Sequence, residues 1–281
     1  MINRLIVGFD GSPSSYAAAN YAFDLGSKLN IPVVGIYVID KRLLDETLLE
    51  DLAGILGFTF YLGISQKVKE ALEKKADVLF QEFAELGRQK GAKVSLVQVE
   101  GIPYEEIAAE ADEDDLIFVG YKGMHLVKGV LIGSTAERVI RKAPCPVFVS
   151  RDNYKPIKRV GIAFDGSPVA RKALKVGAEL AKGYGANLEV IFVEPNESFP
   201  EEVIDQLKAE ADKILGEESA DYTFTLLKGF PEEQLVEYQA NGNVDLLVMG
   251  AFGTRPLKEI LLGSVAYFVM HNAQGPVVFV K

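Results

Sequence analysis

Hydrophobic and polar residues alternate along the chain in two distinct periods. Short runs rich in Val and Ile predict β-strands, and longer stretches with an apolar residue at every third or fourth position predict amphipathic helices. In the first half, the runs that predict strands are Arg4–Phe9, Pro32–Val38, Lys93–Val99, Asp115–Val119 and Pro146–Val149. The stretches that predict helices lie between them, at Ser14–Leu29, Gln66–Lys90, Tyr104–Ala111 and Thr135–Lys142.

The second half shows the same alternation. Strands are predicted at Arg159–Phe164, Asn187–Val193, Tyr222–Leu227, Asp245–Met249 and Pro276–Val280. Helices are predicted at Val169–Tyr184, Glu201–Leu215, Glu232–Ala240 and Val265–Asn272. Runs such as LIFVG from Leu116 are apolar on both faces, which is typical of central parallel strands covered by helices on both sides. The alternation therefore predicts an α/β fold with two tandem doubly wound parallel sheets, whose ligands bind beyond the carboxyl ends of the strands.

The two halves are copies of one domain. The block LIVGFDGSPSSYAAA from Leu5 returns as VGIAFDGSPVARKAL from Val160, at an offset of 155 residues. Blocks beginning at Gly101 and Gly120 return at offsets of 128 and 130, in the same order, which indicates duplication. We therefore predict two domains, at residues 1–152 and 153–281, joined by a polar link too short to hold them apart.

The drop in offset from 155 to 128 locates an insert of 27 residues in the first half. It falls at about residues 41–65, where leucines recur at helical spacing. We expect an added amphipathic helix that docks on its own domain. The alternatives are a lid over the first site and a surface that binds a protein partner.

Composition narrows the range of functions. The chain has 281 residues, of which 48% are hydrophobic, and a net charge of −10 that disfavours a broad nucleic-acid-binding surface. A local anion site built from backbone amides needs no net positive charge. The apolar stretches are too short for a membrane span. The single Cys145 excludes an internal disulfide, and no signal peptide is evident, so a cytoplasmic location is expected.

A glycine-rich segment follows the fourth predicted strand of each half. Glycines let backbone amides approach a phosphate closely, and the last glycine stands where the next helix begins, so the N–H groups and dipole of that helix face the same place. The alternative is a long turn with a serine cap. Neither copy is a Walker P-loop or a GxGxxG fingerprint. The segments comprise Gly120, Gly123, Gly133, Ser134 and Thr135, and their counterparts Gly250, Gly253, Gly263, Ser264 and Val265.

An Asp-Gly-Ser-Pro loop follows the first predicted strand of each half. Ser12 is in the position of a helix N-cap and Pro13 in the first turn. Asp10 and its copy Asp165 need another explanation, because a carboxylate beside phosphates repels them. Such a residue suits a ribose hydroxyl or a divalent cation.

These two pairs of loops resemble those of the universal stress protein family, in a tandem member of its ATP-binding subclass. The resemblance covers nearly the whole chain outside the insert. It implies a Rossmann-like five-stranded sheet of order 3-2-1-4-5 in each half. It also implies that Asp10 and Asp165 lie by the ribose and phosphates, that the backbone of Val38 and Val193 recognises adenine, and that the glycine-rich segments cradle the ribose and phosphates. Val265 departs from the hydroxyl that the family carries there.

The resemblance further implies that the last strands, at Pro146–Ser150 and Pro276–Lys281, pair across a two-fold axis, so that one chain is its own pseudo-dimer and two chains can form a homodimer. The function it implies is a regulatory protein of the stress response that binds ATP, ADP or AMP, with Mg²⁺ near Asp10 and Asp165, and acts on a protein partner. The alternatives are a slow ATP hydrolase or nucleotidyl-transferring enzyme, and a scaffold that uses the insert. Charged residues of the glycine-rich segments, such as Lys122, are expected to be solvated unless they meet the phosphates.

Overall fold

A computed structural model describes residues 1–46, 49, 64–123, 135–194, 200–252 and 262–281. The strands are β1 (Arg4–Gly8), β2 (Pro32–Asp40), β3 (Lys93–Gly101), β4 (Asp115–Gly120), β5 (Val147–Ser150), β6 (Arg159–Ala163), β7 (Asn187–Glu194), β8 (Tyr222–Lys228), β9 (Leu246–Gly250) and β10 (Val277–Val280). The helices are α1 (Pro13–Leu29), the short 3₁₀ helix η1 (Lys41–Leu44), α3 (Ile64–Gln89), α4 (Pro103–Ala109), α5 (Thr135–Lys142), α6 (Pro168–Tyr184), α7 (Glu201–Glu217), α8 (Pro231–Ala240) and α9 (Ser264–Asn272).

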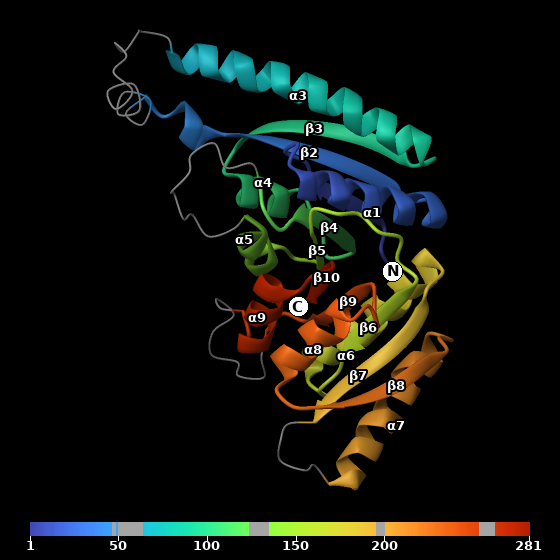
Figure 1. Ribbon diagram of the computed structural model, residues 1–281. Helices are drawn as coiled ribbons and strands as arrows, with labels where there is room; N and C mark the ends of the chain where they lie inside the picture. Colours follow the sequence, from blue (N-terminus) through green and yellow to red (C-terminus); the bar gives the residue numbers. More distant parts are fainter. Residues whose placement is uncertain (47–48, 50–63, 124–134, 195–199, 253–261) are drawn as a thin grey trace.

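The described strands form one continuous sheet of ten, in the order β3-β2-β1-β4-β5-β10-β9-β6-β7-β8 (Figure 1). Each half has the predicted order 3-2-1-4-5, with all of its strands parallel. The halves meet where β5 pairs with β10 in antiparallel fashion, with Val149 opposite Val277 and Phe148 opposite Val278. The expected pairing of the last strands is confirmed, and it joins the two predicted sheets into one.

Helix boundaries follow local chemistry that the two halves share. The hydroxyl of Ser12 accepts a hydrogen bond from the backbone N–H of Ser15 and caps α1, and Ser167 does the same for α6. A proline then occupies the first turn, where its missing N–H costs nothing. The helices end at Asn30 and Gly185 in the left-handed conformation, a common way to terminate a helix.

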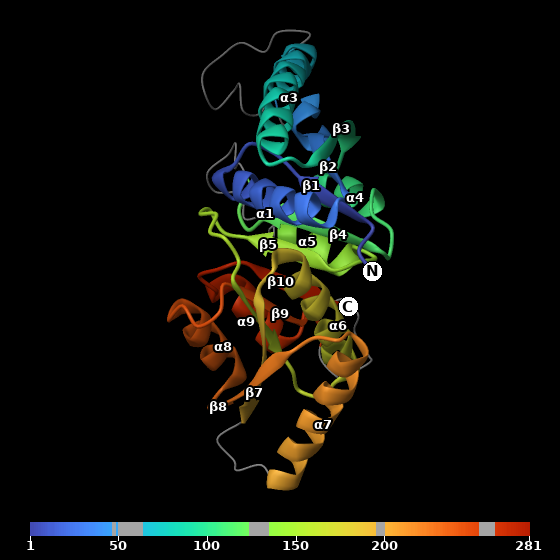
Figure 2. The ribbon, with the colours of Figure 1, turned by 90° about the vertical axis from the view of Figure 1, so that its right-hand side faces the viewer.

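Two helical layers cover the sheet. Helices α1, α3, α6 and α7 pack on one face, and α4, α5, α8 and α9 pack on the other. The molecule is elongated, with α3 near one end and α7 near the other (Figure 2). Each apolar layer runs through both halves, because the inner strands place apolar side chains in both layers, whereas the outermost strands β3 and β8 are only partly buried. The halves therefore share their core.

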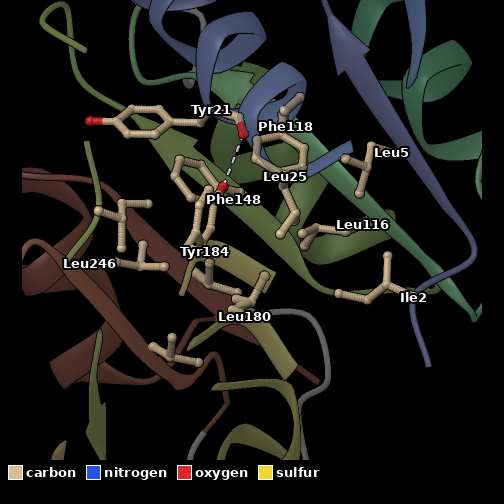
Figure 3. Packing of buried hydrophobic residues seen from close by; sticks show 14 of the residues in the cluster. Ile2, Leu5, Tyr21, Leu25, Leu116, Phe118, Phe148, Leu180, Tyr184 and Leu246 are labelled. Atoms are coloured by element: carbon tan, nitrogen blue, oxygen red, sulfur yellow. Dashed lines mark hydrogen bonds between the residues drawn. The ribbon is translucent and has the colours of Figure 1, made fainter. Parts of the chain in front are cut away.

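Figure 3 shows the place where the halves meet. The hydroxyl of Tyr184 in α6 donates a hydrogen bond of 3.1 Å to the backbone oxygen of Tyr21 in α1. The Tyr21 ring lies 5.0 Å from the Phe148 ring and 4.9 Å from the Tyr154 ring, between centroids. The Tyr21 hydroxyl accepts from the N–H of Lys155 in the link between the halves. The link is thus held against the core, as its short length predicts.

The insert is described only at its ends. After β2 it enters η1, whose first turn is capped by the Asp40 carboxylate, which accepts from the N–H of Arg42. Residues 47–48 and 50–63, where most of the predicted amphipathic helix falls, lie outside the described residues. Helix α3 has 26 residues and its counterpart α7 has 17, so part of the added length extends α3.

Two other expectations concern the whole chain. Cys145 is buried, and burial raises the pKa of its thiol to about 12, as expected of a packed side chain. Among the described residues, no helix combines the length and the apolar character needed to cross a bilayer.

Candidate functional site

The candidate site lies where the order of the strands in the sheet reverses direction, next to the first strand of each half. In the first half β1 lies between β2 and β4, so the crossovers after β1 and β4 leave toward opposite faces of the sheet. A crevice opens at the carboxyl edge between such strands, and it is the usual ligand site of doubly wound sheets. In the second half β6 lies between β7 and β9 in the same way. The four motif-bearing loops begin at these edges.

In the first half, the structure brings Asp10 and Gly123 together. Gly11 adopts a φ of 82°, and the Asp10 Oδ1 atom accepts a hydrogen bond of 2.9 Å from the backbone N–H of Ser12. A Cβ placed on Gly123 would lie 2.9 Å from the Asp10 Oδ2 atom. The carboxylate therefore lies directly beside the backbone at the start of the glycine-rich segment.

Gly120 is required by close packing. A Cβ at this position would collide with the hydroxyl of Ser14 in the first turn of α1. The same hydroxyl donates to the backbone oxygen of Lys122, and the backbone oxygen of Ser14 accepts a 2.6 Å hydrogen bond from the hydroxyl of buried Ser150. The backbone at the end of β4 thus packs directly against Ser14 at the start of α1. This contact sets the direction in which the glycine-rich segment leaves the sheet.

In the second half, the described residues surround a cavity of about 200 Å³ at the carboxyl edge. Its lining comes from the ends of β6, β7 and β9 and from the starts of α6, α8 and α9. Six of the predicted site residues line it: Asp165, Val193, Gly250, Gly263, Ser264 and Val265. The other residues that line the cavity were not among the predicted site residues: Ala163, Phe164, Ser167, Ala170, Ile191, Phe192, Pro231, Leu235, Met249, Phe252 and Ala266. Of these, Phe164 and Ser167 flank Asp165 closely enough that its loop could have indicated them.

The polar groups of this cavity are few. Asp165 is exposed, and its Oδ1 atom accepts a 2.9 Å hydrogen bond from the N–H of Ser167. Gly263 is the N-cap of α9, which has no side-chain cap, and its own N–H donates to the oxygen of Ala251 at 3.0 Å. The first-turn N–H groups of α9 and the Ser264 hydroxyl remain as donors near the cavity. A small number of polar groups in an apolar cavity is typical of a small-molecule site.

A cation that the motifs did not indicate approaches the first-half site. The Lys75 ammonium group, from α3, donates a 3.1 Å hydrogen bond to the backbone oxygen of Asp10 and lies 5.9 Å from the centroid of the Tyr37 ring. Burial lowers the pKa of Lys75, and the charge of Asp10 opposes that change. Burial also raises the pKa of Tyr37, and the charge of Asp10 adds to the effect. Only the packing of α3 on the Asp10 loop could reveal this lysine.

One prediction needs correction, and others fall on residues that the structure does not describe. The second strand does not end at Val38 but continues to Asp40, because β2 pairs with β3 as far as Gly101. Val38 therefore lies inside the strand, whereas Val193 lies one residue before the end of β7. Thr135 begins α5. Gly133, Ser134 and Gly253 lie outside the described residues.

A metal site is not evident in the part of the chain that the structure describes. No group of three or more His, Cys, Asp or Glu side chains there could hold an ion. One carboxylate ligand suits magnesium only when substrate phosphates complete the coordination shell. Magnesium at Asp10 and Asp165 stays a prediction.

Comparison with known proteins identifies the family of this chain. The sequence model of the Universal stress protein family matches residues 1–151 and again residues 156–281. The chain belongs to the universal stress protein family. Each of the two matched segments contains one Asp-Gly-Ser-Pro loop and one glycine-rich segment, so both copies of the site fall within universal stress protein units.

Several universal stress proteins match this chain over nearly its whole length and nearly the whole of their own. A universal stress protein of Synechocystis is 26% identical over 98% of this chain and 99% of its own length. One of Mycobacterium tuberculosis is 26% identical over 99% of this chain and 96% of its own. A universal stress protein structure from Archaeoglobus fulgidus has a TM-score of 0.73 at 20% identity, covering 99% of this chain and 96% of that one. These likenesses support the family and the fold of the full chain.

Proposed function

We propose that this universal stress protein is a regulatory protein of the stress response that binds adenine nucleotides at the carboxyl edge of its sheet. The nucleotide lies in each half between the Asp-Gly-Ser-Pro loop and the glycine-rich segment. One observation carries the proposal: the second-half cavity is lined by both of these motifs together. Membership of the family adds support, because the motifs lie in both matched segments.

Each group in the proposed site has a distinct task. Backbone groups near the carboxyl ends of the second strands, at Val38 inside β2 and at Val193 in β7, meet the adenine edge. Asp10 and Asp165 accept hydrogen bonds from ribose hydroxyls, a role that suits a carboxylate whose other oxygen is held by its own loop. The glycine-rich backbone and the first-turn N–H groups of α5 and α9 face the phosphates, and magnesium bound to those phosphates would meet the aspartates.

Isothermal titration of the full chain with ATP tests the proposal. We expect binding, and in the variant Asp10→Asn with Asp165→Asn we expect roughly 10- to 100-fold weaker binding, the usual worth of a hydrogen bond to a charged group. The matched control is Asp77→Asn with Asp205→Asn, since these aspartates occupy matched positions of α3 and α7 and both are exposed. An absence of heat at millimolar ATP would remove the proposal.

The same samples distinguish binding from catalysis. A regulatory protein that binds ATP retains it unchanged, whereas the alternative of a slow hydrolase predicts steady release of phosphate that the double aspartate variant abolishes. Phosphate release that exceeds the buffer rate in the native chain and matches it in the variant would favour the enzyme. The scaffold alternative predicts that removal of residues 42–63 abolishes recovery of a protein partner but leaves ATP binding intact.

A further inference from the structure

Helix α3 packs against the loop that carries Asp10. Gly11 in this loop has a φ of 82°, and a Cβ placed on it would lie 2.7 Å from the Cδ2 atom of Leu79. One turn earlier on the same face of α3, the Lys75 ammonium group donates a 3.1 Å hydrogen bond to the backbone oxygen of Asp10. The helix therefore supports the loop at two neighbouring residues.

The Lys75 ammonium group and the Asp10 carboxylate interact electrostatically. Lys75 is half-buried, and burial lowers its pKa, whereas the charge of Asp10 acts in the opposite direction. Burial raises the pKa of Tyr37, and the same carboxylate adds to that effect; the Tyr37 ring centroid lies 5.9 Å from the Lys75 nitrogen. Because a half-buried charge is screened less by solvent and salt than an exposed one, Lys75 offsets the charge of Asp10 effectively.

The Asp10 carboxylate needs such compensation if phosphates are to bind beside it. Its Oδ1 atom accepts a 2.9 Å hydrogen bond from the N–H of Ser12. Its Oδ2 atom would lie 2.9 Å from a Cβ on Gly123, at the start of the segment that is proposed to face the phosphates. A carboxylate at this place suits a ribose hydroxyl but repels phosphates. A neutral nucleoside meets no such repulsion, so the need for a nearby cation is specific to nucleotides.

Lys75 belongs to the opposite helical layer from α5. Helix α3 packs in the same apolar layer as α1, whereas α5, whose first-turn N–H groups are proposed to face the phosphates, packs in the other layer. Lys75 therefore acts through Asp10, by supporting the backbone of the loop and by the charge that it places behind the carboxylate.

We propose that Lys75 is a positioning residue of the first-half site, whose ammonium group holds the Asp10 loop and offsets the repulsion between the Asp10 carboxylate and the phosphates of a bound nucleotide. This rests on the proposed function, since it assigns a nucleotide to the site. It adds a specificity: the affinity of the first-half site for ATP depends on Lys75, and its affinity for adenosine depends on Lys75 much less.

Isothermal titration of the full chain with ATP and with adenosine tests the proposal. Every sample carries Asp165→Asn, which weakens the second-half site, so that the tighter equivalent reports on the first. Lys75→Met keeps the apolar stem and removes the charge, so we expect roughly fivefold weaker ATP binding and less than about twofold weaker adenosine binding. Lys75→Arg keeps the charge and should retain ATP affinity within about twofold. Lys74→Met is the matched control, because Lys74 is the exposed neighbour on the same helix, and it should leave both affinities unchanged.

The outcomes of this titration separate the two proposals. An equal loss of ATP and adenosine affinity in Lys75→Met, or an arginine variant as weak as the methionine variant, would show that Lys75 only supports the fold. Unchanged affinities in Lys75→Met would also overturn its role. Both results leave the proposed function standing, which fails only if the parent chain binds neither ligand.

A second measurement needs no substitution and decides the matter if the Lys75 variants do not fold. Acetic anhydride reacts with the neutral amine of a lysine, so a phosphate charge that stabilises the ammonium form slows the reaction. We expect saturating ATP to slow acetylation of Lys75 more than saturating adenosine does, and to leave Lys74 unaffected, as measured by mass spectrometry of the peptides. Equal rates at Lys75 with ATP and with adenosine would overturn the proposal.

Discussion

At the scale of single residues, the site depends on positions where a side chain is excluded. Gly120 packs against the first turn of α1, and Gly123 packs against the carboxylate of Asp10. The Ser14 hydroxyl occupies the space where a Gly120 side chain would lie, and the Asp10 carboxylate does so at Gly123. The backbone itself therefore forms the surface of the site. Glycine is required here for close approach between elements.

Replacement of Gly120 by Ala should destabilise the protein by about 1–3 kcal/mol, because the added methyl group must displace the Ser14 hydroxyl and the backbone behind it. It should also weaken ATP binding, since the glycine-rich segment leaves the sheet at this residue. Thermal melting followed by circular dichroism measures the first effect. Gly216→Ala is the control: it lies in α7 with open space around it, so alanine there should stabilise by about 0.5–1 kcal/mol. Equal melting temperatures for the two variants would contradict the packing argument.

Sequence motifs predicted some residues of the site and missed others. Asp10 and Asp165 were identified from a loop of four residues, because turns and caps are local. Lys75 was not, since its approach to Asp10 depends on how α3 packs over the loop after an insert of unknown shape. The extent of β2 beyond Val38 was also missed, because it depends on pairing with β3.

At the scale of elements, the last strand of each half stabilises the last helix of the other half. Arg151 follows β5, and its guanidinium donates a 2.7 Å hydrogen bond to the backbone oxygen of Met270 near the end of α9. Lys281 follows β10 and donates to the oxygens of Arg141 and Ala143 at the end of α5. A cation at a helix C-terminus satisfies exposed carbonyls and interacts favourably with the helix dipole.

Loss of this reciprocal contact should be measurable. Lys281→Ala is expected to lower the free energy of unfolding by about 0.5–2 kcal/mol, since two charge-assisted hydrogen bonds and the interaction with the helix dipole depend on one ammonium group. Urea denaturation of the full chain measures the change. Lys213→Ala, at an exposed position of α7, should change stability by less than about 0.5 kcal/mol. A Lys281 variant no less stable than the Lys213 variant would show that the contact contributes nothing.

At the scale of the whole molecule, the two halves share one sheet and its apolar layers, so we expect them to unfold together. Tyr184 of the second half is buried between α1 and α6, where its hydroxyl donates to the backbone oxygen of Tyr21. Burial raises the pKa of Tyr184 well above its usual value, and the negative charge of Asp24 adds to the effect. Tyr21 and Tyr154 nearby also have raised pKa values, mainly through burial.

These shifts predict loss of stability in alkali. A folded-state pKa above the unfolded value of about 10 means that the native state holds the proton more firmly, so the stabilisation is complete below pH 10 and declines as the pH rises beyond it. Tyr184→Phe should cost about 1 kcal/mol at pH 7, through loss of the hydrogen bond, and should make the decline above pH 10 shallower. Denaturant midpoints between pH 7 and pH 11 provide the measurement. Tyr267→Phe, at a half-exposed tyrosine, is the control and should leave the midpoint at pH 7 nearly unchanged. A decline in the Tyr184 variant as steep as in the native chain would contradict the prediction.

The sequence by itself determined the duplication, the alternation of strands and helices, and the motif loops, because each rests on local periodicity or on residues a few positions apart. Family resemblance supplied the strand order and the pairing of the last strands. Only the tertiary structure decided that β2 continues to Asp40, that Lys75 reaches Asp10, and that Phe252 joins Val265 in the second cavity. These contacts join residues far apart in the chain, and their geometry depends on packing against both faces of the sheet, which no local pattern encodes.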